Sequence, residues 1–179
     1  MRSRGLPWGL TSRLRRVELL LCDVDGVLTD GSILIGVNTE VKSFHIQDGL
    51  GLGILRRAGI RVGWISNRPS AATARRAKEL KIDFLRQEKR SKVAVIEELL
   101  AHQKLGWDQV CYVGDDIVDL GPLKRAGLGI AVANAVPEVV AQADYVTHAQ
   151  GGKGAVREVC ELLLKAQDHW QGILTSYFS

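Results

Sequence analysis

The sequence contains few cysteines, and they are not arranged for a disulfide framework or a metal site. Cys22, Cys111 and Cys160 are far apart, and each lies inside an apolar stretch. An odd number of isolated cysteines argues against a disulfide-stapled fold and favours a reducing compartment. We therefore expect three buried thiols that behave as small hydrophobic side chains.

Long hydrophobic runs are also absent, since no apolar stretch approaches the ~20 residues that a membrane-spanning helix needs. The N-terminal segment is basic but lacks the continuous apolar segment and the cleavage site of a secretory signal. These absences predict a cytoplasmic protein with no membrane partner. We expect residues 1–16 to form a flexible basic tail, residues 17–170 a single domain and residues 171–179 a C-terminal tail.

The chain also lacks a strong charge of one sign. Its net charge is +4, the basic residues are scattered, and the four tryptophans are dispersed. No basic stripe is interleaved with aromatic residues, which argues against nucleic acid as a partner. A mild positive charge instead suits an anionic substrate.

Short apolar runs alternate with amphipathic segments along the whole chain. We expect strands at Glu18–Val24, Ile60–Ser66, Phe84–Gln87, Val110–Gly114, Gly129–Ala133 and Tyr145–Thr147. Helices are expected at Ile54–Ala58, Pro69–Lys81, Ser91–Lys104, Asp116–Ala126 and Ala155–Gln167. This alternation predicts an α/β fold with a doubly wound, Rossmann-like parallel sheet.

One segment, Ser32–Ile46, interrupts the alternation and reads as a β-hairpin inserted after the first strand, around Asn38-Thr39. Ile33, Ile35 and Val37 fall on one face of it. A two-stranded ribbon is marginal in water on its own, so something must cover that face. Either the parent domain or another subunit covers it.

Polar residues follow several predicted strands at the point where each strand ends. In doubly wound sheets, ligands bind beyond these carboxyl ends, so we expect the side chains to meet over one crevice. The residues are Asp23, Asp25, Ser66, Asn67, Arg68, Lys92, Asp115, Asp116 and Asp119.

These residue types suit phosphoryl transfer. Several carboxylates in one crevice need a counter-cation, and oxygen ligands with open positions suit Mg²⁺. Aspartate can attack phosphorus, and a second carboxyl two residues later can move protons. Ser66 and Lys92 can bind the phosphoryl oxygens through a hydroxyl and a point charge.

The ordered set resembles the haloacid dehalogenase superfamily of aspartate-nucleophile phosphatases, over roughly residues 17–167. The resemblance implies that Asp23 is the nucleophile and Asp25 the general acid and base. It implies that Asp23, the carbonyl group of Asp25 and Asp115 hold Mg²⁺, with Asp116 and Asp119 in support. It also implies that Ser66, Asn67, Arg68 and Lys92 bind substrate or phosphate.

Four stretches are similar to the family of 3-deoxy-D-manno-octulosonate 8-phosphate phosphatases of lipopolysaccharide biosynthesis: DVDGVLTDG, FHIQDGLGL, VGDDIVDL and GGKGAVREVCELLL. This resemblance implies a phosphorylated sugar acid as substrate, no large cap domain, and a homotetramer built through the hairpin. It gives Asp48 and Gly49 a role beside the substrate, although Asp48 also suits a helix N-cap. It makes Lys153 and Arg157 candidates for contacts in a neighbouring subunit's site.

Two positions depart from the family pattern and leave the sugar open. Asn67 stands where glycine is usual, and Lys153 stands where arginine is common. A 2-keto-3-deoxynonulosonate 9-phosphate phosphatase is therefore an alternative. A phosphoacceptor receiver domain is an alternative of another class, but Asp25, placed two residues after Asp23 on the first strand, favours turnover.

Overall fold

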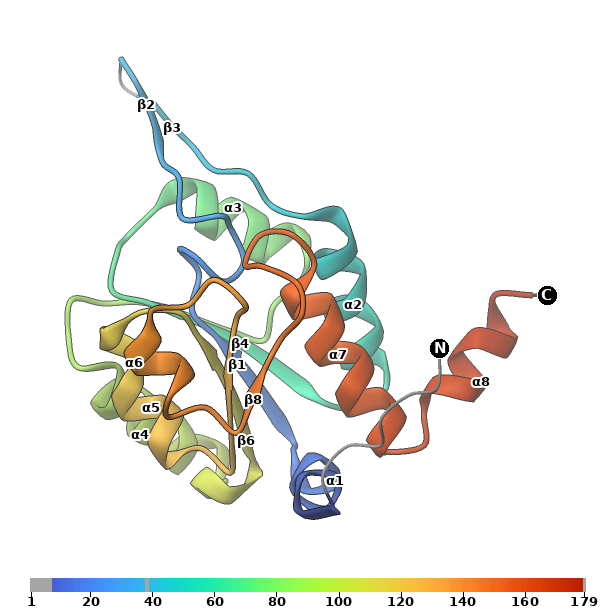
Figure 1. Cartoon of the computed structure of the whole chain (residues 1–179). Helices are drawn as coiled ribbons and strands as arrows, with labels where there is room; N and C mark the ends of the chain where they lie inside the picture. Colours follow the sequence, from blue (N-terminus) through green and yellow to red (C-terminus); the bar gives the residue numbers. More distant parts are fainter. Residues whose placement is uncertain (1–7, 38, 179) are drawn as a thin grey trace.

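A six-stranded parallel sheet forms the centre of the molecule, in the strand order β5-β4-β1-β6-β7-β8. The computed structural model describes residues 8–37 and 39–178. The strands are β1 (Leu19–Cys22), β4 (Arg61–Ser66), β5 (Phe84–Gln87), β6 (Val110–Gly114), β7 (Leu128–Ala131) and β8 (Tyr145–Val146). This topology confirms the predicted α/β class. Within the described residues, the chain has no large cap domain (Figure 1).

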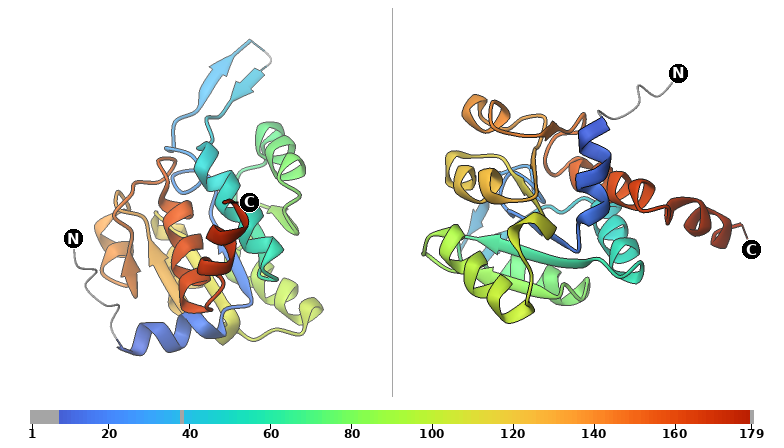
Figure 2. Two further views of the ribbon diagram at one scale, coloured as in Figure 1. Left: turned by 90° about the vertical axis from the view of Figure 1, so that its right-hand side faces the viewer. Right: turned by 90° about the horizontal axis from the view of Figure 1, so that it is seen from below.

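Helices cover both faces of the sheet, as the view from below shows (Figure 2). The face of β1 that carries Leu20 and Cys22 packs in one core, and the face that carries Leu19 and Leu21 packs in another. The first core is shared with α1 (Trp8–Arg16), α2 (Ile46–Arg57), α3 (Ala71–Glu79) and α7 (Ala155–Ala166). The second is shared with α4 (Lys92–Gln103), α5 (Leu120–Arg125) and α6 (Pro137–Val140). Short 3₁₀ turns, η1 (Trp107–Gln109) and η2 (Ile117–Asp119), and the last helix, α8 (Trp170–Ser176), complete the chain.

Local chemistry explains where the helices begin. Helix α3 starts after Ser70, whose hydroxyl accepts the backbone N–H of Thr73 at 3.3 Å. The predicted start at Pro69 is therefore too early by two residues. Helix α2 begins at Ile46, well before the predicted Ile54, because the glycines in IQDGLGLGILRR hide its helical pattern.

The N-terminal segment corrects one prediction, because residues 8–16 form helix α1 instead of a flexible tail. Leu10 and Leu14 lie four residues apart on one face and are buried in the core. Arg13 also binds both carboxylate oxygens of Asp144, at 2.7 and 2.6 Å. The rest of the predicted tail, residues 1–7, lies outside the described residues. At the other end, most of the predicted C-terminal tail is helix α8.

The hairpin consists of β2 (Leu34–Gly36) and β3 (Thr39–Val41), paired antiparallel. It projects from the body of the molecule (Figure 1). Ile35 and Val37 are 83% and 92% exposed, so the parent domain does not cover them. Asn38, at the predicted turn, lies outside the described residues.

The three cysteines are buried and unpaired, as the sequence predicts. Over residues 8–37 and 39–178, no helix combines the length and apolar character needed to cross a membrane.

Candidate active site

The carboxyl ends of β1, β4 and β6 meet at one crevice, together with the first residue of α4. Its cavity measures about 230 Å³. It is lined by Asp23, Asp25, Ser66, Asn67, Arg68, Lys92, Asp116 and Val118. Most of the residues that the sequence singles out at strand ends therefore lie together.

Lys92 links the carboxylates at the floor of the crevice. Its Nζ donates to Asp23 Oδ1 at 2.6 Å and to Asp119 Oδ1 at 2.7 Å. The Tyr112 hydroxyl donates to the same oxygen of Asp119. Lys92, Asp23 and Asp119 are all buried. Burial opposes the charge on Lys92, but the carboxylates of Asp23 and Asp119 outweigh it and raise the pKa of the ammonium group.

The crevice holds more negative charge than Lys92 offsets. Burial raises the pKa of Asp23 to about 6, against the opposing effect of Lys92. Burial, with Asp23 and Asp119 nearby, raises the pKa of Asp115 to about 8. Like charges in a site of low polarity cause such shifts, and a divalent cation reverses them.

The donor set fits Mg²⁺. Asp23, Asp115 and Asp119 each offer a carboxylate oxygen within 4.8 Å of the others. Asp119 is already saturated, because its second oxygen accepts the N–H groups of Asp115 and Asp116. Asp115 Oδ1 is buried and has no hydrogen-bond partner among the described residues. Asp23 and Asp115 are thus the carboxylates available to a cation, and Asp119 orients the loop that carries Asp115.

Gly26 is required where it stands. It adopts a φ of +100°, and a Cβ there would lie 2.0 Å from Asp115 Oδ2. Gly151 in turn packs on this loop, because a Cβ at Gly151 would lie 1.7 Å from the Gly26 carbonyl oxygen. The glycine-rich segment therefore packs against the loop that follows Asp25 in its own chain.

The Ser66–Arg68 turn faces the crevice from β4. The Ser66 hydroxyl accepts the N–H of Arg68 at 3.0 Å and is buried beside the crevice. The Asn67 amide donates to the carbonyl groups of Glu88 and Arg90, at 2.8 and 2.6 Å. Asn67 thus ties its own turn to the loop at Glu88 and Arg90 through its amide N–H groups.

Four predicted site residues lie apart from both the crevice lining and its carboxylate cluster in this single chain. Asp48 is buried and accepts the N–H of Arg157 at 2.7 Å, which joins α2 to the start of α7. Gly49 lies beside Arg76, since a Cβ there would lie 2.7 Å from its guanidinium group. The Arg157 side chain binds Glu161 at 2.9 Å, and Lys153 is exposed.

Two functional candidates on the hairpin are missing from the sequence prediction. Lys42 donates to Asp25 at 2.6 Å, and Glu40 binds Arg68. The alternation of charged and apolar residues in TEVKSF was a usable signal, because in an extended segment it places both charges on one side; Glu40 lies in the last strand of the hairpin and Lys42 directly follows it.

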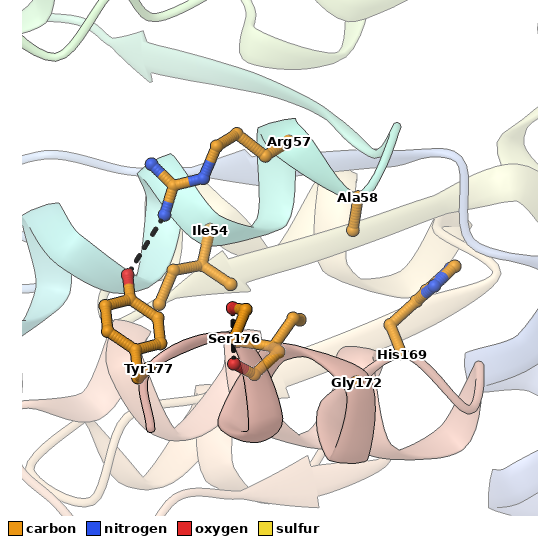
Figure 3. Close-up of a pocket in the computed structure, with 8 residues that line it drawn as sticks. Ile54, Arg57, Ala58, His169, Gly172, Ser176 and Tyr177 are labelled. Carbon is orange, nitrogen blue, oxygen red and sulfur yellow. Dashed lines mark hydrogen bonds between the residues drawn. The ribbon is translucent and has the colours of Figure 1, made fainter. Parts of the chain in front are cut away.

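A larger cavity of about 330 Å³ lies elsewhere, between α2 and α8 (Figure 3). Arg57 donates to the Tyr177 hydroxyl across it at 3.2 Å. Among the described residues that line it there is no carboxylate: Ile54, Arg57, Ala58, His169, Gly172, Ile173, Ser176 and Tyr177. The chemistry therefore belongs to the smaller crevice.

Comparison with known proteins points to one family. Residues 57–159 match the model of the haloacid dehalogenase-like hydrolases. The chain is 42% identical, over 161 residues, to 3-deoxy-D-manno-octulosonate 8-phosphate phosphatase of Yersinia pestis, and the match covers 89% of this chain and 86% of that protein.

Solved structures agree in fold over nearly the whole chain. A probable YrbI family phosphatase from Pseudomonas syringae superposes with a TM-score of 0.94 at 42% identity, covering 97% of this chain and 99% of the other. The 3-deoxy-D-manno-octulosonate 8-phosphate phosphatase of Moraxella catarrhalis, in complex with magnesium ion, phosphate ion and KDO, superposes with a TM-score of 0.92 at 40% identity, covering 94% of this chain and 97% of the other.

Proposed function

The chain belongs to the haloacid dehalogenase-like hydrolases, in the family of the 3-deoxy-D-manno-octulosonate 8-phosphate phosphatases, and from this premise we propose that it hydrolyses that sugar phosphate with Mg²⁺ through an aspartyl-phosphate. The observation that carries the proposal is the crevice itself. A buried aspartate, a second aspartate two residues later, a lysine and a hydroxyl converge there from separate elements of the fold.

In the first step, the Asp23 carboxylate attacks phosphorus and the bond to the sugar oxygen breaks. Asp25 gives its proton to that leaving oxygen, so the sugar departs as an alcohol. Lys92 lies 2.6 Å from Asp23 and offsets the charge that gathers on the phosphoryl group. The Ser66 hydroxyl lines the crevice and donates to the Arg68 carbonyl group at 3.2 Å, and on this proposal it would turn to donate to a phosphoryl oxygen.

In the second step, Asp25 takes a proton from water, and the water oxygen attacks the phosphorus of the aspartyl-phosphate. Inorganic phosphate leaves and the Asp23 carboxylate is restored. Asp23, Asp115 and the carbonyl group of Asp25 would hold Mg²⁺, which when bound supplies positive charge for the phosphoryl oxygens.

The substrate assignment rests on the relatives. The proteins of Y. pestis and M. catarrhalis are named for 3-deoxy-D-manno-octulosonate 8-phosphate, and the M. catarrhalis structure contains KDO. These relatives are phosphatases, which favours turnover over a receiver domain. The ratio of kcat/KM on the octulosonate 8-phosphate and on 2-keto-3-deoxynonulosonate 9-phosphate tests the remaining alternative.

We also infer that the chain forms a homotetramer through the hairpin, where neighbouring subunits close each crevice. The exposed side chains of Ile35 and Val37 support this inference, because neighbouring apolar side chains that are exposed together mark an interaction site. Lys153 is exposed and free to reach a neighbouring site. The Arg157 side chain would first have to leave Glu161.

The Asp23→Asn variant tests the mechanism. Amide nitrogen is not a nucleophile toward phosphorus here, so phosphate release should fall at least about 10³-fold while the protein stays folded. Asp108→Asn is the matched control, since this exposed aspartate lies in η1, before the amino end of β6. Phosphate release at the wild-type rate from Asp23→Asn would overturn the proposal.

A further inference from the structure

Two charged side chains of the hairpin contact residues that line the crevice. Glu40 lies in β3 and binds Arg68, and Lys42, which follows the last residue of β3, binds Asp25. Val41 between them points the other way and is 52% exposed. Glu40 and Lys42 thus contact residues of the active site, while Val41 between them faces outward.

Lys42 binds Asp25. Its Nζ donates to Asp25 Oδ1 at 2.6 Å and to the Thr73 hydroxyl at 3.3 Å, and lies 3.9 Å from Glu40 Oε1. The Lys42 side chain is fully buried, whereas that of Asp25 keeps 22% of its surface exposed. Among the described residues, no group hydrogen bonds to Asp25 Oδ2. Lys42 therefore fixes one oxygen of Asp25 and leaves the other for the crevice.

Glu40 binds Arg68, as Lys42 binds Asp25. One oxygen of Glu40 accepts from the Arg68 guanidinium group, and the other accepts from the Ser70 hydroxyl at 2.6 Å. Arg68 lines the crevice. Glu40 and Lys42 of the hairpin thus hold two residues of the site, which come from two different loops.

We propose that Lys42 and Glu40 are positioning residues for the hydrolysis: Lys42 orients Asp25 for proton transfer, and Glu40 orients Arg68 for substrate binding. This inference rests on the proposed phosphatase function. Lys42 cannot itself contact a substrate, because its side chain has no exposed surface. A buried ammonium group is tolerated only while it is paired, so the contact with Asp25 is maintained.

The consequence is a division of labour between the two residues. Proton transfer to the leaving group requires a defined carboxyl orientation, and general acid–base catalysis contributes about 10²–10⁴-fold. Loss of Lys42 should therefore act on kcat. Loss of Glu40 should act on KM, because Arg68 would no longer be held toward the bound substrate.

Lys42→Met and Glu40→Gln, both close in size to the native residues, test this division on the full chain with Mg²⁺. We expect kcat on the octulosonate 8-phosphate to fall at least about tenfold in Lys42→Met, with KM within about twofold. In Glu40→Gln, KM should rise about fivefold with kcat within about twofold. If both variants change kcat and KM in the same way, the proposal is wrong.

The leaving group separates positioning from a general structural defect. 4-Nitrophenol is a good leaving group that needs little protonation, so the first-turnover release of 4-nitrophenol from 4-nitrophenyl phosphate should stay near the wild-type rate in Lys42→Met. First-turnover release of the sugar should fall at least about tenfold. An equal loss on both substrates would mean that Lys42 only supports the fold. Thr73→Val, which removes the second partner of Lys42, should show the same selectivity with a smaller loss.

A crystal structure of Lys42→Met gives a readout that does not depend on activity. A changed Asp25 side-chain rotamer supports the proposal, and an unchanged rotamer overturns it. If the wild-type protein released phosphate no faster than Asp23→Asn, the proposed function would instead be wrong. Failure of the positioning proposal can therefore be told apart from failure of the proposed function.

Discussion

Two regions of this molecule reverse the usual distribution of polar and apolar side chains. The crevice buries Asp23, Lys92 and Asp119, which are 6%, 4% and 0% exposed. The hairpin exposes Ile35 and Val37, which are 83% and 92% exposed. Charged side chains are rarely buried unless paired, and exposed large apolar groups in a cluster mark an interaction site.

The difference shows that each region is incomplete in a different way. In the crevice, Lys92 contacts two carboxylates, while Asp115 Oδ1 is buried with no hydrogen-bond partner among the residues that the structure describes, so the site suits a cation. The described part of the chain leaves Ile35 and Val37 of the hairpin uncovered, and the proposed interface with another subunit would cover them. A bound cation would complete the first region, and the proposed assembly would complete the second.

The largest effect is expected from breaking the charge balance of the crevice with Lys92→Met. Two buried carboxylates would then face each other without their lysine, so turnover should fall at least about 100-fold. Without Mg²⁺, the free energy of unfolding should fall by about 3 kcal/mol at neutral pH. Phosphate release and denaturant unfolding measure these two changes.

The control for that variant is Lys89→Met, which removes an exposed lysine three residues away. Its turnover and its free energy of unfolding should stay within about twofold and 0.5 kcal/mol of wild type. Equal behaviour of the two variants would show that burial of Lys92 is unimportant.

The next effect concerns the cation. Because Mg²⁺ binds the folded protein, Mg²⁺ at about 100 times its Kd should add about 2.7 kcal/mol to the free energy of unfolding. Asp115→Asn should raise the Mg²⁺ concentration needed for half of this gain, and for half-maximal activity, at least about tenfold. Asp116→Asn, at the neighbouring exposed carboxylate, should change both much less. A thermal-shift titration with Mg²⁺ and an EDTA control measures the difference.

A smaller effect on turnover is expected from changing the hairpin. Ile35→Lys with Val37→Lys places charge where apolar contact is needed, so the assembly should dissociate toward single subunits. We expect kcat/KM to fall only about threefold, because the crevice residues of each subunit stay in place. Analytical ultracentrifugation checks the assembly, and Val140→Lys, at an exposed apolar residue on α6, is the control. An unchanged subunit count would contradict the hairpin interface.

The smallest effect concerns Glu158, a partly buried carboxylate whose charge is stabilised by hydrogen bonds within its own chain. Its carboxylate lies 3.0 Å from Nδ1 of the His148 ring and accepts from the Tyr145 hydroxyl and the backbone N–H groups of Ala149 and His148. Burial opposes the charge, but the contact with the His148 ring, together with the other hydrogen bonds, outweighs it and holds the pKa of Glu158 below 4.5. The stabilisation is therefore complete above pH 4.5 and is lost as the pH falls through the lower pKa of the folded state.

We accordingly expect Glu158→Gln to lower the free energy of unfolding by about 1 kcal/mol at pH 7, without changing kcat. The gap between variant and wild type should narrow as the pH falls below 4.5. Glu138→Gln, at an exposed glutamate, should leave the wild-type curve unchanged at every pH. A gap that persists at low pH would contradict this account.

Much of the fold could be predicted because it depends on local patterns. The strand Val110–Gly114 lies where the alternation places it, since it is a short apolar run between polar segments, and the predicted strand Phe84–Gln87 is also present. Helix α1 could not be predicted from composition, because its many arginines resemble a solvated tail. Its helix depends on burial of Leu10 and Leu14 against α7 and the sheet, which only the folded chain provides.

The candidate site divides in the same way. Asp23, Asp25 and Asp115 could be singled out because strand ends bring short acidic motifs to one edge of a parallel sheet. Asp48 could not be placed, because an aspartate at a helix start suits both a cap and a ligand site. In the structure it accepts a hydrogen bond from Arg157, 109 residues away.

The sequence by itself determined the family, the α/β class and the acidic motifs at the strand ends, because these follow from residue order and short-range periodicity. Only the tertiary structure decided which charges meet: Lys42 with Asp25, Glu40 with Arg68, and Lys92 with both Asp23 and Asp119. The Lys92–Asp23 pair joins residues 69 positions apart, and packing of whole elements sets such contacts. The physical reason is that a buried charge is stable only with a partner in the right place, and position in space is a property of the folded chain.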